Sequence, residues 1–284
     1  VVGLLGIKPV LVDVDPNTFN IDPEAVRKAI TPNTKAIVPV HVFGQCANMD
    51  EIMAIAKEHD LFVVEDNAQA IGADYTSSSG ETKKGGTIGH IGTTSFFPSK
   101  NLGCYGDGGA IFTNDDDLAA SMRMIVNHGM RVRYYHDSIG VNSRLDSIQA
   151  AILRVKLPHL NGYCDRRRAA ADFYDAAFAN VSQLDTPARD PKSTHVFHQY
   201  TLKTNGIDRA ALQEHLSGKQ VPAMIYYPVP LHNQKPYAHN GYRDEDFTVT
   251  NALCECVISL PMHSELTEEQ QQFIVDSILE FINK

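Results

Sequence analysis

The fold is indicated first by the stretch Leu61-Phe62-Val63-Val64-Glu65-Asp66, an apolar run of strand length that ends in two acids. Before it, Met49–His59 has apolar residues on a helical period, which predicts a helix. An earlier apolar run, Lys35–Val42, follows a helix that Asp22-Pro23-Glu24 would open and that would run to about Ile30. Strands that alternate with helices indicate βαβ units. We therefore expect an α/β fold with a mostly parallel sheet covered by helices on both faces.

The remaining segments of the N-terminal half extend this pattern. A polar segment rich in Ser, Gly and Lys, residues 73–87, predicts an exposed hairpin or loop. The acids Asp115-Asp116-Asp117 suit the positive end of a helix dipole, so we expect a helix from about Leu118 to Asn127. Three further strands are expected at Val10–Val14, Thr93–Phe97 and Gly109–Thr113.

A chain of 284 residues is long enough for one large domain or two modest ones. Two long helices are predicted at Leu145–Leu157 and Leu160–Phe178, broken at Pro158. We place a boundary there, between a large sheet domain over residues 1–158 and a small α+β domain over residues 159–284. The small domain is expected to hold strands at Phe197–Lys203 and 221–227 and helices at 208–217 and Glu268–Ile282.

The charge balance and the length of the apolar runs argue against two classes of partner, nucleic acids and membranes. Lys and Arg number 25 against 34 Asp and Glu, and the formal net charge is −9. The longest basic run is Arg166-Arg167-Arg168, so the basic stripe of a nucleic-acid-binding protein is missing. Apolar runs stay well short of the roughly 20 residues that span a bilayer. We therefore expect neither a nucleic-acid nor a membrane partner.

Cofactor and metal motifs narrow the chemistry further. The five cysteines form no C-x-x-C pair and the histidines no H-E-x-x-H, so we expect no metal site and reduced, mostly buried thiols in a cytoplasmic protein. No G-x-x-x-x-G-K-[ST] motif is present. The glycines at 86, 89 and 92, and those at 103, 106, 108 and 109, lead into strands, which argues against a dinucleotide-binding turn.

One pair of residues fits a known chemistry. Asp66 and Lys100 each follow a predicted strand, and in an open parallel sheet ligands bind beyond the carboxyl ends of the strands. Pyridoxal phosphate needs a lysine that forms a Schiff base and a carboxylate that keeps the pyridine nitrogen protonated. On spacing alone, surface charges remain the commoner explanation.

Six longer sequence blocks are distinctive: 63–70 (VVEDNAQA), 94–103 (TSFFPSKNLG), 106–110 (GDGGA), 141–146 (VNSRLD), 226–232 (YYPVPLH) and 259–263 (SLPMH). These blocks, in this order, resemble the DegT family of nucleotide-sugar aminotransferases, which are pyridoxal-phosphate enzymes of fold type I. The resemblance spans the chain and implies a fold type I transferase with a large domain and a small C-terminal one.

The resemblance also implies a role for each of several residues. Lys100 would carry the cofactor, pyridoxal 5′-phosphate, and later shuttle a proton, while Asp66 would hold the pyridinium N–H. Gln69 would contact the cofactor ring, and Ser95 its phosphate. Asn142 would reach the phosphate of the neighbouring subunit's cofactor, which implies a homodimer with shared active sites.

The implied substrates are glutamate and a UDP-linked ketosugar, with Arg144 and Tyr226 at the sugar. The segments Gly103–Gly109 and Gly140–Arg144 most resemble those of the family branch that aminates a UDP-linked 3-oxo sugar acid for polysaccharide biosynthesis. A 3-keto or 4-keto deoxysugar aminotransferase is an alternative. A non-catalytic or regulatory protein that binds pyridoxal phosphate or a sugar nucleotide is another.

Simpler roles stay open for the individual residues. They are local turn or strand-end hydrogen bonds for Gln69 and Ser95, a left-handed turn for Asn142, an ion pair with Asp146 for Arg144, and core packing for Tyr226 and Tyr227. Family members carry further residues before the block that begins here at Val1. The resemblance therefore implies that the chain lacks an N-terminal segment with part of the phosphate site.

Overall fold

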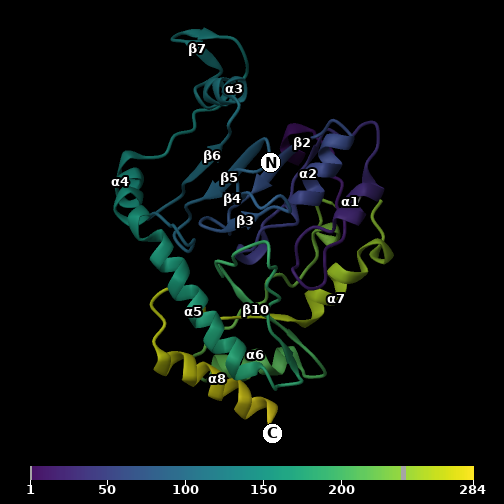
Figure 1. Ribbon diagram of the computed structural model, residues 1–284, viewed down its shortest axis with the longest axis vertical. Helices are drawn as coiled ribbons and strands as arrows, with labels where there is room; N and C mark the ends of the chain where they lie inside the picture. The colour runs from purple at the N-terminus through teal and green to yellow at the C-terminus, as the bar shows by residue number, and fades with distance from the viewer. Residues whose placement is uncertain (1, 238–240) are drawn as a thin grey trace.

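The structure is a computed structural model and describes residues 2–237 and 241–284 (Figure 1). Its central sheet has the order β1-β2-β5-β6, formed by β1 (Ala36–Ile37), β2 (Phe62–Asp66), β5 (Ile91–Ser95) and β6 (Gly109–Phe112). β1, β2 and β5 pair in parallel, whereas β6 runs antiparallel to β5. The predicted α/β fold with a mostly parallel sheet is confirmed.

Helices α1 (Pro23–Ala29) and α2 (Met49–Glu58) form where the sequence predicts them. Each begins at a side-chain cap: Asp22 accepts a hydrogen bond from the backbone N–H of Glu24, and Asn48 from that of Glu51. Helix α2 shares a core with β1 and β2. The residues of α2 that are buried in this core are Met49, Ile52, Ile55 and Ala56.

The opposite face of the sheet is more open than the sequence predicts. Phe62 is 52% exposed and Ile111 is 51% exposed. Along β2 the buried positions are Val63 and Glu65, so burial alternates as expected for a strand with one covered face. Helix coverage in the described residues is therefore uneven between the two faces.

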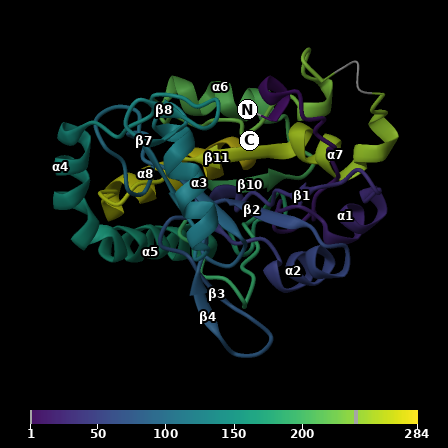
Figure 2. The same ribbon diagram turned by 90° about the horizontal axis from the view of Figure 1, so that it is seen from above.

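The polar segment 73–87 forms a hairpin of β3 (Asp74–Thr76) and β4 (Thr82–Lys84), which projects from the body of the molecule in Figure 2. The acids Asp115-Asp116-Asp117 open α3 (Asp116–Val126), with Asp115 as its N-cap. A second hairpin follows, of β7 (Met130–Val132) and β8 (Tyr135–His136). Together, residues 116–144 form an arm that extends away from the sheet (Figure 1).

The strand predicted at Val10–Val14 is wrong. This segment makes only an isolated bridge, Val14 to Ile21, whose two bonds run from the N–H of Asp15 to the Asn20 carbonyl and from the N–H of Asp22 to the Asp13 carbonyl. Before the bridge, the N–H of Leu11 donates to the Tyr242 hydroxyl at 3.0 Å, outside any sheet, so the pairing does not extend into a strand.

Near Pro158 the chain stays helical. Helix α4 (Ser147–Lys156) passes through a 3₁₀ turn, η3 (Leu157–His159), into α5 (Leu160–Phe178). Pro158 has no N–H to donate to the carbonyl four residues earlier, a bond that an unbroken α-helix would make, and the chain passes this point as a 3₁₀ turn. The expected break is thus a change of helix type, and the boundary between residues 158 and 159 stays a prediction.

The C-terminal part is a three-stranded antiparallel sheet with helices, as predicted for an α+β layer pair. Its elements are β9 (Leu184–Asp185), β10 (Tyr200–Thr204), α6 (Arg209–Gly218), α7 (Thr248–Cys256), β11 (Val257–Leu260) and α8 (Glu268–Ile282). The strand order is β11-β10-β9. Segment 221–227 joins this sheet through a bridge from Met224 to Ser259, and α7 and β11 were not predicted from the sequence. Further short 3₁₀ turns of the chain are η1 (Val2–Leu5), η2 (Val42–Gly44), η4 (Leu231–Asn233) and η5 (Asp244–Phe247).

The parallel-sheet part and the C-terminal part each have an apolar core, and α5 contributes to both. Leu160 and Cys164 pack in the core beneath the parallel sheet. Tyr174 and Phe178, further along the same helix, pack in the core of the C-terminal part. None of the helices in the described residues is long and apolar enough to cross a membrane.

The two ends of the chain are joined by a helix cap. The Asp13 carboxylate accepts hydrogen bonds from the N–H groups of Val249 (2.9 Å) and Thr250 (2.8 Å) and from the Thr250 hydroxyl (2.6 Å). These donors lie in the first turn of α7, whose own N-cap Phe247 offers no side-chain bond. Burial raises the pKa of Asp13, but the hydroxyl and amide donors outweigh it and hold that pKa below its usual value.

We predict that Asp13→Ala lowers the free energy of unfolding by about 1–2 kcal/mol, the usual cost of losing a helix cap. Urea denaturation at pH 7 measures this. Thr250→Val, which removes one of the three donors, should cost less.

The sign of the pH dependence follows from the lowered pKa. The contribution of Asp13 is present above the carboxyl's unfolded pKa and is lost as the pH falls through the lower folded value. The stability difference between wild type and Asp13→Ala should therefore shrink in acid. A difference that is the same at pH 2 and pH 7 would contradict this account.

Candidate active site

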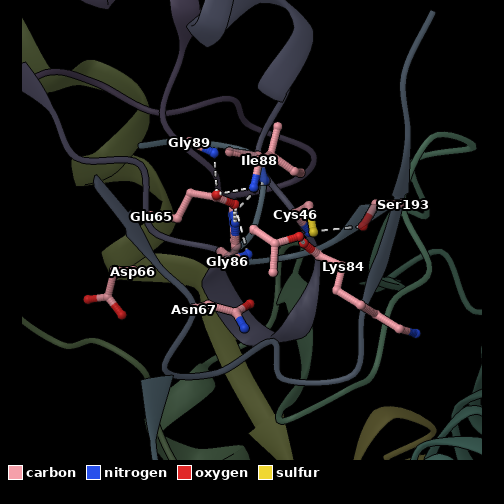
Figure 3. Close-up of polar contacts among 12 residues, drawn as sticks. Cys46, Glu65, Asp66, Asn67, Lys84, Gly86, Ile88, Gly89 and Ser193 are labelled. Atoms are coloured by element: carbon pink, nitrogen blue, oxygen red, sulfur yellow. Dashed lines mark hydrogen bonds and ion pairs between the residues drawn. The ribbon is translucent and has the colours of Figure 1, made fainter. Parts of the chain in front are cut away.

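Asp66 and Ser95 lie on the same face of the sheet. Asp66 ends β2 and Ser95 ends β5, and the register pairs Asp66 with Thr93. Because side chains alternate along a strand, Thr93 and Ser95 both point to the side of Asp66, while Glu65 points to the other. Figure 3 shows Asp66 directed away from the contacts of Glu65. The face that carries the two residues is the open one.

The Asp66 carboxylate keeps room for a ligand. Its Oδ1 accepts one hydrogen bond, from the N–H of Ala68 at 3.0 Å. The backbone is fixed on both sides, since the N–H of Asp66 donates to the Pro39 carbonyl and its carbonyl accepts from the N–H of His41. Asp66 is therefore a rigidly placed acid with acceptor capacity left over.

Lys100 lies in the loop after β5, where its N–H donates to the Phe97 carbonyl at 2.9 Å. The neighbouring Asn101 side chain donates to the Val196 carbonyl at 3.0 Å, which fastens the loop to segment 195–199. Burial lowers the pKa of Lys100, and the Asp66 carboxylate opposes that shift. The amine thus feels the charge of Asp66 and loses its proton more readily than an exposed lysine.

Two buried residues near this lysine, Asn101 and His198, carry polar atoms without a hydrogen-bond partner in the part of the chain that the structure describes. The His198 imidazole is buried, and its burial, together with the charges of Lys100 and Arg167, lowers its pKa to about 3. In the described residues, the Nδ1 of His198 and the Oδ1 of Asn101 have no hydrogen-bond partner. Buried polar atoms usually have one, so the unpaired Nδ1 of His198, a residue that feels the charge of Lys100, suits a site that receives polar ligand groups. Sequence reasoning missed both residues, because their burial depends on distant segments.

The side chain of Gln69, three residues after Asp66, bonds to two other segments. Its Oε1 accepts a hydrogen bond from the N–H of Phe43 at 2.7 Å, and its Nε2 donates to the Tyr227 hydroxyl at 3.2 Å. Tyr227 is 54% exposed and Tyr226 beside it is half-buried, so neither is a core aromatic. The structure brings the predicted residue Tyr226 to this place, although the hydroxyl that contacts Gln69 belongs to its neighbour.

Asn142 and Arg144 lie apart, on the arm between β8 and α4. Asn142 forms a bridge with Asn127, and the Arg144 guanidinium donates to the Asn127 side chain at 2.8 Å. Both residues are exposed, and in the described part of the chain no hydrogen bond or ion pair joins them to Asp66, Gln69, Ser95 or Lys100. Of the seven predicted residues, Asn142 and Arg144 therefore lie apart from the other five: Asp66, Gln69, Ser95, Lys100 and Tyr226.

The match to the DegT/DnrJ/EryC1/StrS aminotransferase family runs over residues 1–279. The chain is 49% identical over 278 residues to a pleiotropic regulatory protein of Geobacillus stearothermophilus, covering 97% of this chain and 73% of that protein. It is 44% identical over 265 residues to the UDP-2-acetamido-2-deoxy-3-oxo-D-glucuronate aminotransferase of Pseudomonas aeruginosa, covering 93% and 71%. The crystal structure of S. venezuelae DesV with a ketimine intermediate matches with a TM-score of 0.93 at 37% identity, covering 100% of this chain and 74% of that one.

These likenesses take in the parallel sheet, the loop with Lys100 and the C-terminal part alike. Sequence and structure agree, because the same chain segments carry the matched blocks and the matched fold. The chain therefore belongs to the DegT/DnrJ/EryC1/StrS aminotransferase family, whose members have the fold type I architecture seen here.

Proposed function

We propose that this chain is a pyridoxal-phosphate-dependent aminotransferase that moves an amino group from glutamate to the keto carbon of a UDP-linked sugar for polysaccharide biosynthesis. One observation carries the proposal. A half-buried lysine in the loop after β5, Lys100, has a lowered pKa and lies within electrostatic reach of Asp66, the last residue of the neighbouring strand β2. The names of the family and of the Pseudomonas relative support the reaction and the substrate class.

The residues present fit the cofactor. Lys100 supplies an amine that burial makes easier to deprotonate, and Asp66 supplies a carboxylate with a free acceptor. Gln69 and Ser95 flank them, Ser95 with a hydroxyl that accepts only the N–H of Phe97 at 3.2 Å in the described residues. When bound, pyridoxal phosphate supplies a carbonyl that links to amines and a ring that accepts electrons from the bond to be broken.

Each residue then has a definite task. Asp66 would hold a proton on the ring nitrogen through a charge-assisted hydrogen bond. Lys100 would anchor the cofactor and could also carry a proton at Nζ. Ser95 would bind the phosphate, and Gln69, whose side chain is held by the N–H of Phe43, would contact the ring.

The arm carries the two residues that we assign to the sugar and to the second subunit, Arg144 and Asn142. In the described residues, Asn142 and Arg144 bond to Asn127 and make no hydrogen bond to Lys100 of their own chain, so we propose that they complete the site of a partner in a homodimer. Exposed apolar side chains on the arm support this arrangement: Val132, Tyr134, Tyr135, Ile139 and Val141. The Arg144 guanidinium, now bonded to Asn127, suits a sugar carboxylate because it can bind both oxygens.

A second candidate is suggested by the Geobacillus relative, which is named a regulatory protein. A protein that only binds its ligand has no need of a covalent amine, so Lys100 beside Asp66 favours the enzyme. The four buried cysteines are compatible with a reducing compartment, and a cytoplasmic location remains part of this proposal.

Lys100→Ala should abolish transamination, with a loss of about a thousandfold or more, because both the covalent anchor and the proton carrier are removed. Borohydride treatment followed by mass spectrometry should find reduced cofactor on wild type and none on the variant. Lys84→Ala, an exposed lysine on the β3–β4 hairpin, is the matched control. A variant that still carries reducible cofactor would refute the assignment of Lys100.

Mixing two inactive variants tests the shared site. Asn142→Asp places a negative charge where the partner's phosphate would bind, so it should be inactive alone, as should Lys100→Ala. A hybrid dimer has one intact site, and an equal mixture should regain about a quarter of wild-type activity if subunits pair at random. An active monomer in sedimentation, or no recovery after confirmed subunit exchange, would exclude the arrangement.

Arg144→Gln tests the substrate class. Single-turnover amination of a panel of UDP- and dTDP-linked keto-sugars should show a preference of wild type for a 3-oxo sugar acid. The variant should lose about tenfold of that preference, the size of one charged hydrogen bond, with less change in the half-reaction with glutamate. Equal wild-type rates for acidic and neutral sugars would remove the acidic sugar from the proposal and leave an aminotransferase of 3-keto or 4-keto deoxysugars.

A further inference from the structure

Behind Asp66, on the covered side of the sheet, lies a fully buried charge that the reaction described above does not use. The side chains of Glu65 and His41 are both 0% exposed. Glu65 Oε2 accepts from His41 Nε2 at 2.8 Å and from the N–H of Gly86 at 2.8 Å, and Oε1 accepts from the N–H groups of Ile88 (2.7 Å) and Gly89 (2.6 Å). Figure 3 shows this convergence of backbone donors on Glu65.

The hydrogen bonds fix the protonation of the pair. The N–H of Ala47 donates to His41 Nδ1 at 3.1 Å, so Nδ1 carries a lone pair and the ring proton sits on Nε2, facing Glu65. Four donors leave no place for a proton on the carboxyl group. The pair is thus a carboxylate bound to a neutral imidazole, with one net negative charge.

The same contacts join Glu65 to the backbone around Asp66. His41 donates from its side chain to Glu65 and from its backbone N–H to the Asp66 carbonyl at 3.0 Å. The loop 85–89 that Glu65 binds leads directly into β5, which pairs with Asp66 and ends at Ser95. Thr93 adds a bond from its hydroxyl to the Glu65 carbonyl. Glu65 therefore holds β2 and β5 in register at the end where the catalytic groups lie.

The glycines of this loop make the arrangement possible. Gly86 has a φ of +84°, and a Cβ on Gly92 would lie 1.8 Å from the Gly86 carbonyl oxygen. Side chains at these two positions would push the loop away from Glu65. The three-residue spacing of Gly86, Gly89 and Gly92, which fits no dinucleotide turn, is accounted for by a loop that folds over a buried carboxylate.

We propose that Glu65 is a positioning residue of the reaction: as a buried carboxylate bound to the neutral Nε2–H form of His41, it fixes the backbone of Asp66 so that Asp66 keeps the cofactor's ring nitrogen protonated. This inference rests on the proposed function for its second half. Its first half, the charge state of the pair, concerns the protein alone.

The charge state is tested on the unmodified protein. Long-range ¹H–¹⁵N NMR of the imidazoles, with His41 assigned by its loss in His41→Gln, should show His41 as the neutral Nε2–H form at pH 7. A doubly protonated ring or the Nδ1–H form would overturn the proposed pair, whatever the cofactor does.

Positioning is tested by the ¹⁵N shift of the ring nitrogen of labelled pyridoxal phosphate on the protein. Asp66→Asn marks the limit in which the acid is lost. Glu65→Gln keeps the size but replaces an acceptor by a donor that faces N–H groups, so its shift should move from the wild-type value toward that limit, and its dissociation constant for pyridoxal phosphate should rise about tenfold or more. Glu65→Asp, which keeps the charge, should recover part of both changes.

Ser193→Ala is the matched control. It removes a buried hydrogen bond, from the N–H of Cys46 at 2.9 Å, in the same region but away from β2 (Figure 3). It should lower the unfolding temperature and leave the ¹⁵N shift unchanged. A wild-type shift in Glu65→Gln, or an equal shift in Ser193→Ala, would overturn the positioning role; if Glu65→Gln does not fold, the comparison of Glu65→Asp with Ser193→Ala decides in the same way. Failure of wild type to link covalently to pyridoxal phosphate would instead overturn the proposed function, and the positioning role with it.

Discussion

A carboxylate without access to water is the constraint on which the end of the sheet with Asp66 and Ser95 depends. An isolated buried charge is costly, so the chain must bring donors to Glu65 from His41 and from the loop 85–89. Satisfying that requirement determines how the loop enters β5 and how the segment before α2 meets the end of β2. The open face of the same strands then carries Asp66 and Ser95 in fixed positions. A structural demand on one face of the sheet thus sets the geometry of the other.

A second set of contacts orders the lysine and the glutamine together. Segment 195–199 receives the Asn101 side chain at the Val196 carbonyl, and its Gln199 N–H donates to the carbonyl of Phe43, whose own N–H binds Gln69. Arg167 of α5 donates to the carbonyls of Phe197 (2.8 Å) and His198 (3.3 Å). Segment 195–199, which lies between the two cores, therefore contacts both sides of the proposed cofactor site. Movement of the C-terminal part against the sheet would therefore displace the loop that carries Lys100.

The arm has the opposite character. Its contacts are local, as in the bond between Arg144 and Asn127, and many of its apolar side chains face solvent. Apolar area of this kind is unfavourable unless something covers it. The rigid sheet end and the exposed arm are therefore complementary: one supplies placed groups for a cofactor, and the other supplies groups that a second copy could use. A site divided in this way would exist only in the assembled protein.

Much of this protein can be read from local sequence, because local signals have local causes. The caps at Asp22 and Asp115, the apolar runs of β2 and β5 and the family blocks around Asp66 and Lys100 predicted the α/β fold and the acid–lysine pair. What depended on contacts between distant segments could not be predicted. Val10–Val14 has the composition of a strand but bonds to Tyr242, and Asp13 caps a helix more than 230 residues away. Glu65 looks like any strand-end acid until the fold closes four N–H groups around it, since the energy of a buried charge is decided by its neighbours in space and not by its neighbours in sequence.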